Sequence, residues 1–239
     1  EKIMALPKLD IPTYTLELPS NREEIKYRPF LVKEQKTLVI LQESENKKDI
    51  MNGLQELVAN CTFGKLNTLN MTIFDFEYVF LKIRCKSVGE TAELSLLCPD
   101  DDETRVNTTI NLDEVDVQVN DEHTDTIQIT DEISMVLRWP TVKDISELEL
   151  DSGSLVDNVL SLFNRCVSKI IEGDTIHNRI DMSNTDLEEF VDSLPTSTFE
   201  KVGEFFDTMP QLLHIVNVVN PKTKVESEVV IQGLENFFG

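Results

Sequence analysis

Hydrophobic and polar residues alternate in some stretches of the chain and recur at helical spacing in others. Three prolines in the first 20 residues exclude a helix there, and the pattern predicts an extended arm that ends in a strand at residues 14–18. Residues 24–30 alternate in the same way after a short polar turn. The two stretches together predict an N-terminal β-hairpin.

The spacing changes at Val32, where apolar residues begin to recur every three or four positions. This period predicts one helix from Val32 and a second that ends near Cys61, with a helix stop and a cap between them at residues 44–46. A third amphipathic helix is predicted over residues 73–86, and Gly89 follows just past its end. The first part of the chain is therefore a hairpin followed by helices.

The alternating pattern returns after the third helix. Residues 93–97 and 106–112 are predicted strands on either side of an acidic turn, which makes a second hairpin. Residues 127–139 alternate in part and predict two short strands that end at a Trp-Pro pair.

The second half is predicted to be mainly helical. Residues 155–171 carry apolar side chains on one side of a helix, and shorter helices are expected at 186–193 and 199–207. Asn184 or Thr185 is the expected cap of the first of these shorter helices. The chain then closes with a third hairpin.

The predicted fold class is α+β, with an N-terminal β-hairpin and helices, two ribbon-like β-hairpins and a helical second half. We expect one unit over residues 1–140 and another over 141–239, with a single compact fold as the alternative. The turns of the two ribbon-like hairpins, residues 98–100 and 220–222, each place a proline second. Their comparable positions indicate an internal repeat, although proline after a strand is also a common turn device.

The composition is that of a folded, strongly acidic protein. Of the 239 residues 40% are hydrophobic, and 22 Lys plus Arg against 44 Asp plus Glu give a net charge of −22. Such a surface repels phosphate backbones and anionic lipid, so nucleic acid and membrane are not expected partners. No apolar run approaches the roughly 20 residues that cross a bilayer. The four scattered cysteines suggest reduced thiols in a cytosolic setting.

The turn at Cys98-Pro99 stands where a zinc ribbon has its first ligand. A ribbon would place a second cysteine two or three residues later, but Asp100 to Asp102 stand there instead. Calcium would need aspartates at alternate positions and a glycine, and this turn has neither. We therefore expect a solvated turn and no bound metal or other cofactor.

The sequence contains no recognisable catalytic motif. There is no Gly-x-Ser-x-Gly, no glycine-rich phosphate loop and no His-Glu-x-x-His. Carboxylate pairs are so frequent that none can be singled out as a general acid and base. A non-enzymatic protein is the prediction, and an uncharacterised hydrolase is the remote alternative.

Several short segments, in this order, resemble the baseplate hub proteins of T4-like contractile-tailed phages. They are YRPFLVKE at residues 27–34, FDFEYVFL at 74–81, RCKSVGE at 84–90 and GLENFF at 233–238. The resemblance is strong over residues 5–98, weak through the middle and present again at the last few residues. It implies a protein of the baseplate hub.

The resemblance also bears on the acidic turn. Members of the family often carry Cys-x-x-Cys turns in both ribbon-like hairpins, and this chain keeps only Cys98 of those positions. The turn is therefore similar to a ribbon that has lost its metal, held by strand pairing and packing.

The family includes a hub subunit and a factor that promotes hub assembly. The first prediction is a non-enzymatic assembly factor or chaperone that contacts other phage baseplate hub proteins in the cytoplasm of the infected host. A permanent structural subunit of the virion tail baseplate is the alternative, and self-association is left open.

Charged and aromatic residues within the resembling segments are the candidates for partner contact. Internal ion pairing is the competing interpretation for the charged ones, and docking onto the protein's own core is the competing one for the two C-terminal phenylalanines. The candidates are Arg28, Phe30, Lys33, Glu34, Arg84, Lys86, Glu90, Phe237 and Phe238.

Overall fold

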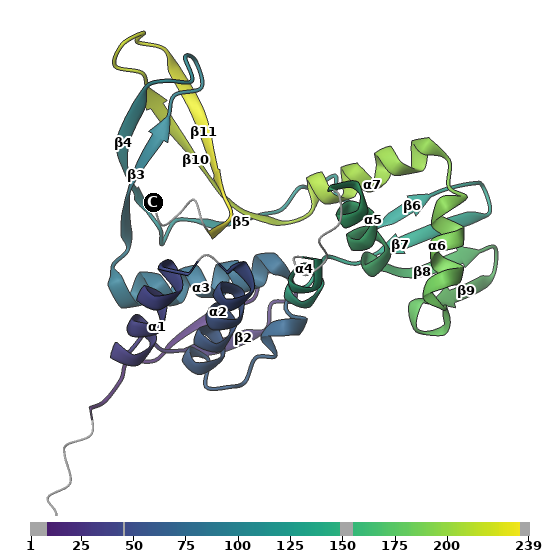
Figure 1. Cartoon of the computed structure of the whole chain (residues 1–239), viewed down its shortest axis with the longest axis horizontal. Coiled ribbons are helices and arrows are strands. Elements are labelled where there is room, and N and C mark those ends of the chain that lie inside the picture. Colours follow the sequence, from purple (N-terminus) through teal and green to yellow (C-terminus); the bar gives the residue numbers. More distant parts are fainter. Residues whose placement is uncertain (1–8, 45, 149–154, 235–239) are drawn as a thin grey trace, which may run out of the picture.

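The structure is a computed structural model that describes residues 9–44, 46–148 and 155–234 (Figure 1). Within these residues the α-helices are α1 (Val32–Gln42), α2 (Lys47–Cys61), α3 (Ile73–Val88), α4 (Val142–Leu148), α5 (Leu155–Cys166), α6 (Asn184–Asp192) and α7 (Thr196–Thr208). The strands are β1 (Tyr14–Glu17), β2 (Glu24–Tyr27), β3 (Thr91–Leu97), β4 (Arg105–Asn111), β5 (Asp116–Gln118), β6 (Thr126–Gln128), β7 (Ile133–Leu137), β8 (Val167–Glu172), β9 (Thr175–Asn178), β10 (Gln211–Val219) and β11 (Glu226–Gln232). The α+β class is confirmed.

The N-terminal hairpin and the first three helices enclose one core. Strands β1 and β2 pair antiparallel, and Ile25 and Tyr27 point into the core beside Leu57 and Val58 of α2. Helices α1 and α2 approach closely at Gly53, where a Cβ atom would lie 2.5 Å from Leu41. The predicted hairpin and the two predicted helices are therefore confirmed.

Helix α3 is shared between two cores. Its N-terminus is capped by Thr72, whose hydroxyl accepts from the Asp75 amide at 3.3 Å, and it ends at Gly89 with a φ of 135°. Phe76 and Phe80 face the first core, while other α3 side chains face the ribbon-like hairpins. A helix that is apolar on two faces is buried between layers.

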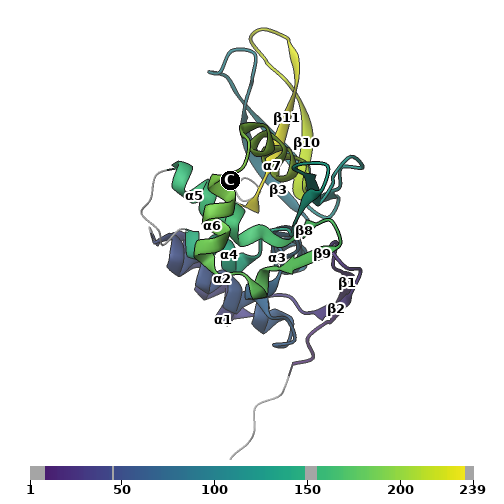
Figure 2. The same ribbon diagram turned by 90° about the vertical axis from the view of Figure 1, so that its right-hand side faces the viewer.

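The two ribbon-like hairpins, β3–β4 and β10–β11, stand side by side on α3 (Figures 1 and 2). Leu94 and Ile110 of the first hairpin pack with Leu212 and Ile231 of the second. The short strand β5, which the sequence pattern did not indicate, pairs with the start of β10. Both predicted hairpins are confirmed, 120 residues apart in sequence at their tips.

The third core lies between a four-stranded antiparallel sheet and three helices. The sheet order is β6-β7-β8-β9, and α5, α6 and α7 pack on it (Figure 1). Buried residues such as Met135, Phe163 and Phe205 fill the space between the layers. This arrangement satisfies the usual need of a sheet face and a helix stripe to bury each other.

The helix predicted over residues 155–171 is wrong at its end. Helix α5 stops at Cys166, and the next residues form β8, in which Met135 of β7 lies opposite Ile170. Val167, Ile170 and Ile171 fit a helical period, but β-branched residues also fit a half-buried strand, and sheet pairing decides the outcome. The second half is therefore less helical than its sequence pattern indicated.

Three smaller differences follow from local signals. Helix α6 begins at Asn184, two residues earlier than predicted, because Ser183 is its cap and its hydroxyl accepts from the Asp186 amide at 3.1 Å. Strand β9 follows a tight turn in which Gly173 has a φ of 53°. Helix α4 was not predicted, and its Val142 is buried against the first core.

The division of the chain near residue 140 stays a prediction. The second and third cores contain elements from both predicted units. The second core combines β3 and β4 from before residue 140 with β10 and β11 from after it. The third core contains β6 and β7 from before residue 140 together with α5 to α7 from after it.

Candidate protein-interaction site

A buried ion pair joins the N-terminal hairpin to α1. Arg28, just after β2, donates from Nη2 to Glu34 Oε1 at 2.8 Å, and the two residues are 7% and 3% exposed. Glu34 also accepts the amide of Leu31 at 2.8 Å, which caps the first turn of α1. Burial acts to raise the pKa of Glu34, but these hydrogen bonds outweigh it and lower the pKa from 4.5 to about 2.

The other candidate residues in the described chain also have partners inside the molecule. The Phe30 amide donates to Ser87 at 2.8 Å, and the Phe30 ring lies 6.0 Å from that of Phe80. Arg84 donates to the carbonyl of Gly89 at 2.9 Å. These contacts fix the junction of strand, helix and hairpin.

Lys86 and Glu90 form an ion pair at 2.6 Å near the end of α3. Lys33 lies 3.3 Å from Glu34, yet its side chain is 65% exposed and open to a partner. Phe237 and Phe238 lie outside the described residues. The role of all these residues in partner contact stays a prediction.

Next to this junction, the outer side of α1 is apolar. Val32, Val39 and Ile40 are 74%, 47% and 66% exposed, and they recur at positions that lie on one side of a helix. With Gln35 and Lys36 they line a groove of about 380 Å³. We call these five residues the α1 stripe.

The sequence segments that resemble baseplate hub proteins did not single out the α1 stripe. The signal was present in the segment VKEQKTLVILQ, which is apolar on the side of Leu38 and again on the side of Val39 and Ile40. A surface helix normally carries charged or polar residues on its outer side. Adjacent exposed apolar residues therefore indicate a surface that a partner covers.

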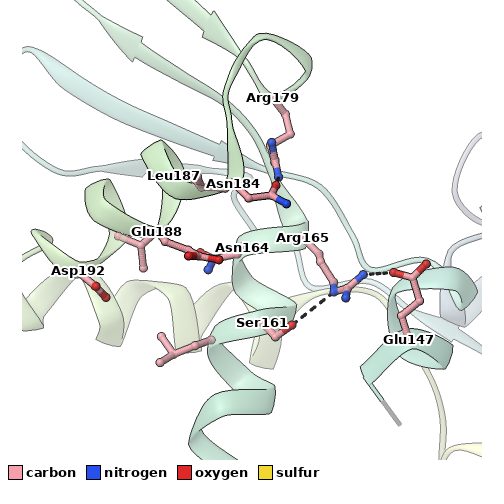
Figure 3. Close-up of a pocket in the computed structure, with 11 residues that line it drawn as sticks. Glu147, Ser161, Asn164, Arg165, Arg179, Asn184, Leu187, Glu188 and Asp192 are labelled. Carbon is pink, nitrogen blue, oxygen red and sulfur yellow. Dashed lines mark hydrogen bonds and ion pairs between the residues drawn. The ribbon is translucent and has the colours of Figure 1, made fainter. Parts of the chain in front are cut away.

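A separate pocket of about 670 Å³ lies between α4, α5 and α6 (Figure 3). Arg165 of α5 points to Glu147 of α4 and donates to it, and it also lies 3.4 Å from the hydroxyl of Ser161. Arginine is permanently protonated and cannot act as the base that would activate a serine. Arg179, on the other side, donates to Asn184 at 2.5 Å.

The side chains that line this pocket are therefore suited to polar contacts. Its guanidinium groups already have partners, and its hydroxyl lacks the neighbouring base that a nucleophile needs. Among the described residues, no group of three or more His, Cys, Asp or Glu side chains could hold a metal ion. The pocket gives no support to a hydrolase.

The turns of the two ribbon-like hairpins meet at their tips but do not form a zinc site. Cys98 is buried, and the facing turn offers Asn220 and Lys222 where a ribbon would have cysteines. An amide and an ammonium group are not zinc ligands. Asp100 is instead hydrogen-bonded to Asn220 and Thr223, so the residues present do not fit the metal.

Residues 11–239 match the family model described as T4 bacteriophage base plate protein. The chain belongs to this family. No curated protein and no solved structure matches it. As a baseplate protein of a T4-like phage, it has a baseplate-related role, and the family implies contacts with other phage baseplate proteins.

The family also suggests a location in the virion tail and a structural or assembly role. In the parts of the chain that the structure describes, the helices are too short or too polar to cross a membrane. The resemblance to baseplate hub proteins and the family match agree that this chain is a baseplate protein of a T4-like phage.

Proposed function

We propose that this protein is a non-enzymatic assembly factor of the baseplate hub, which acts by covering a surface of an incomplete hub protein until the next subunit joins. The observation that carries the proposal is the α1 stripe, with Val32, Val39 and Ile40 exposed on one side of a helix. A contiguous apolar surface is costly to leave in water and is typical of protein–protein contact.

The neighbouring ion pair supports this use of α1. Arg28 and Glu34 are buried and hydrogen-bonded, so they hold the first turn of the helix in place before a partner arrives. A preformed surface loses less conformational entropy on binding than one that must first become ordered. The buried pair thus contributes by positioning the stripe, while Lys33 lies exposed at its border.

Charge supports a heterologous partner. The net charge of −22 makes two copies repel each other, whereas Lys36 in the stripe and Lys33 at its border give it a local positive charge. An apolar helix or loop with acidic flanks, on another hub protein, is the complementary surface. Nucleic acid and membrane are not part of the proposal, and neither is a cofactor.

The test is co-expression of the full chain with the other baseplate hub proteins of its phage, followed by size-exclusion chromatography with light scattering. We expect a complex at micromolar concentration. A chain that stays monomeric in the presence of every hub protein would contradict the proposal.

Mass spectrometry of purified tails separates the assembly factor from the permanent structural subunit. An assembly factor acts in the host cytoplasm and is absent from finished particles. A stoichiometric amount of the chain in purified tails would favour the structural subunit instead.

A further inference from the structure

The two ribbon-like hairpins have similar turns, the first longer by one residue, but their outer faces differ in chemistry. In each hairpin the amide four residues on donates to the carbonyl of the first turn residue, from Asp102 to Cys98 at 3.1 Å and from Lys224 to Asn220 at 2.9 Å. Asp102 and Lys224 both have positive φ, at 51° and 65°. The hairpins are thus matched in shape, and their surfaces can be compared position by position.

The outer face of the β3–β4 hairpin is polar. Its exposed residues, which alternate with the buried ones, are mostly hydroxyl, amide and charged side chains. They are Thr91, Glu93, Ser95, Arg105, Asn107 and Thr109, with Leu97 as the apolar member. This is the expected pattern for a strand pair with one face in water.

The outer face of the β10–β11 hairpin is apolar at the corresponding place. Ile215 and Val230 are cross-strand partners and are 51% and 56% exposed, and Val219 lies further toward the tip. Because Ile215 and Val230 lie directly opposite each other, they form one continuous patch. Single exposed valines are normal on a protein surface and need no explanation. A cross-strand apolar patch that is absent from the similar β3–β4 hairpin does need one.

Strand β11 is also an unprotected edge. The sheet order is β11-β10-β5, so β11 pairs with a neighbour on one side only among the described residues. Edge strands usually carry a lysine, a proline or a bulge that prevents further pairing. The seven residues of β11, Glu226–Gln232, include no lysine or proline, and their register with β10 is continuous.

Charge selects the occupant of this edge. Strands β10 and β11 contain Glu226 and Glu228 and no lysine or arginine. A second copy would bring two more glutamates and a further net charge of −22 to the same place. A segment with basic residues between apolar ones would instead pair its apolar side with Ile215 and Val230 and its cations with the glutamates.

We propose that the free edge of β11 and the outer face of the β10–β11 hairpin bind an extended, basic and apolar segment of another baseplate protein as an added β-strand. This inference rests on the proposed function, because it supplies a second contact between the chain and its hub partner. The two contacts differ in the partner segment that they bind. The β10–β11 hairpin binds a basic segment, and the α1 stripe binds one with acidic flanks.

The test measures backbone amide hydrogen exchange of the full chain, alone and co-purified with the baseplate hub proteins of its phage. We expect the amides of Glu226, Glu228 and Val230 to become protected in the complex. The register with β10 leaves their N–H groups facing the free edge, where an added strand accepts hydrogen bonds from them. This measurement uses the wild-type chain and needs no variant to fold.

Substitutions give the second arm. Val230→Lys places a cation at the centre of the apolar patch, and the fraction of chain in the complex should fall about tenfold. Val230→Thr keeps β-branching and should give a smaller loss in the same direction. The matched control is Thr109→Lys on the outer face of β3–β4, which should leave complex formation unchanged.

Each outcome decides the inference. Protection of β11 together with a loss specific to Val230→Lys supports it. A complex that forms with unprotected β11 and with equal tolerance of both lysine substitutions overturns it and leaves the proposed function standing. A wild-type chain that dimerises alone through β11 identifies a second copy as the occupant, and a chain that binds no hub protein overturns the inference together with the proposed function.

Discussion

Asn220 donates from its side-chain amide to both carboxylate oxygens of Asp100, at 3.0 and 3.1 Å, and so joins the tips of two hairpins that are 120 residues apart in sequence. The Thr223 hydroxyl donates to the same carboxylate at 2.5 Å. These hydrogen bonds lower the pKa of Asp100, with Thr223 as the larger cause and Asn220 as the next. The contact occupies the place between the turns where a ribbon would hold its metal.

Asn220→Ala should therefore destabilise the paired hairpins. Asn220 is fully buried, and its side chain also accepts the Lys222 amide at 2.8 Å, so the substitution removes hydrogen bonds within its own turn and to the Asp100 carboxylate. The expected loss is about 1–3 kcal/mol in the free energy of unfolding. Thermal unfolding followed by circular dichroism measures it, and Thr109→Ala, on an exposed face, is the control that should stay near wild type.

Glu34 predicts a loss of stability in acid. Its pKa is about 2 in the folded protein and near 4.5 otherwise, so the unfolded chain binds the proton more readily. The stabilisation is complete above pH 4.5 and is lost as the pH falls toward 2. Denaturant unfolding at a series of pH values should show this decline.

Glu34→Gln is the matching substitution. It leaves the buried Arg28 without its carboxylate, which should cost about 3 kcal/mol at neutral pH. The variant should also lose the part of the acid dependence that belongs to residue 34. A variant as stable as wild type at pH 7 would show that the ion pair does not hold the junction.

The amino-acid sequence predicts the elements whose local signals agree with their packing. Gly89 marks the end of α3 in the sequence as it does in the structure. The end of α5 was missed because Val167 and Ile170 fit both a helix and a strand, and only pairing with β7, 30 or more residues earlier, decides between them. Long-range pairing of that kind leaves no local signal.

The candidate site was predictable in part. The motif around Arg28 and Glu34 lies beside the α1 stripe on which the proposed function rests. These two charges pair with each other inside the molecule, and the apolar residues beside them are the exposed ones. Charged residues in an apolar motif cannot be assigned to the inside or the outside without the fold. The run LLHIVNVV of β10 did indicate a second exposed apolar surface, since both of its alternating sets are mainly apolar.

Glu77 predicts a pH dependence of the opposite sign. Burial raises its pKa from 4.5 to about 7, against the smaller effect of the hydrogen bond from the Leu234 amide. The folded protein therefore binds the proton more readily than the unfolded chain. Stability from this group is complete below pH 4.5 and falls as the pH rises toward 7.

Glu77→Gln should remove this dependence, because glutamine is neutral and its carbonyl can still accept from Leu234. The variant should melt at a higher temperature than wild type at pH 8 and at about the same temperature at pH 4. Thermal unfolding at the two pH values checks it, with Glu56→Gln on the exposed side of α2 as the control. A variant that is less stable than wild type at pH 8 would show that the charged carboxylate is stabilising there.

The α1 stripe gives the prediction that tests the proposed function most directly. Ile40→Ser changes a residue that is 66% exposed, so the free energy of unfolding should change by no more than about 0.5 kcal/mol. Binding should nevertheless weaken by about tenfold, because an apolar side chain at the centre of a contact contributes most when water is excluded from it. Light scattering of the co-expressed hub complex measures the fraction bound.

The control for Ile40→Ser is Asn52→Ser on the exposed side of α2, which lies outside the stripe. It should leave both stability and complex formation unchanged. Val39→Ser should weaken binding in the same way as Ile40→Ser, since both side chains line the groove. If the hub complex forms equally well with both stripe variants, the partner contact lies elsewhere on the chain, and the buried Arg28–Glu34 pair then serves the fold alone.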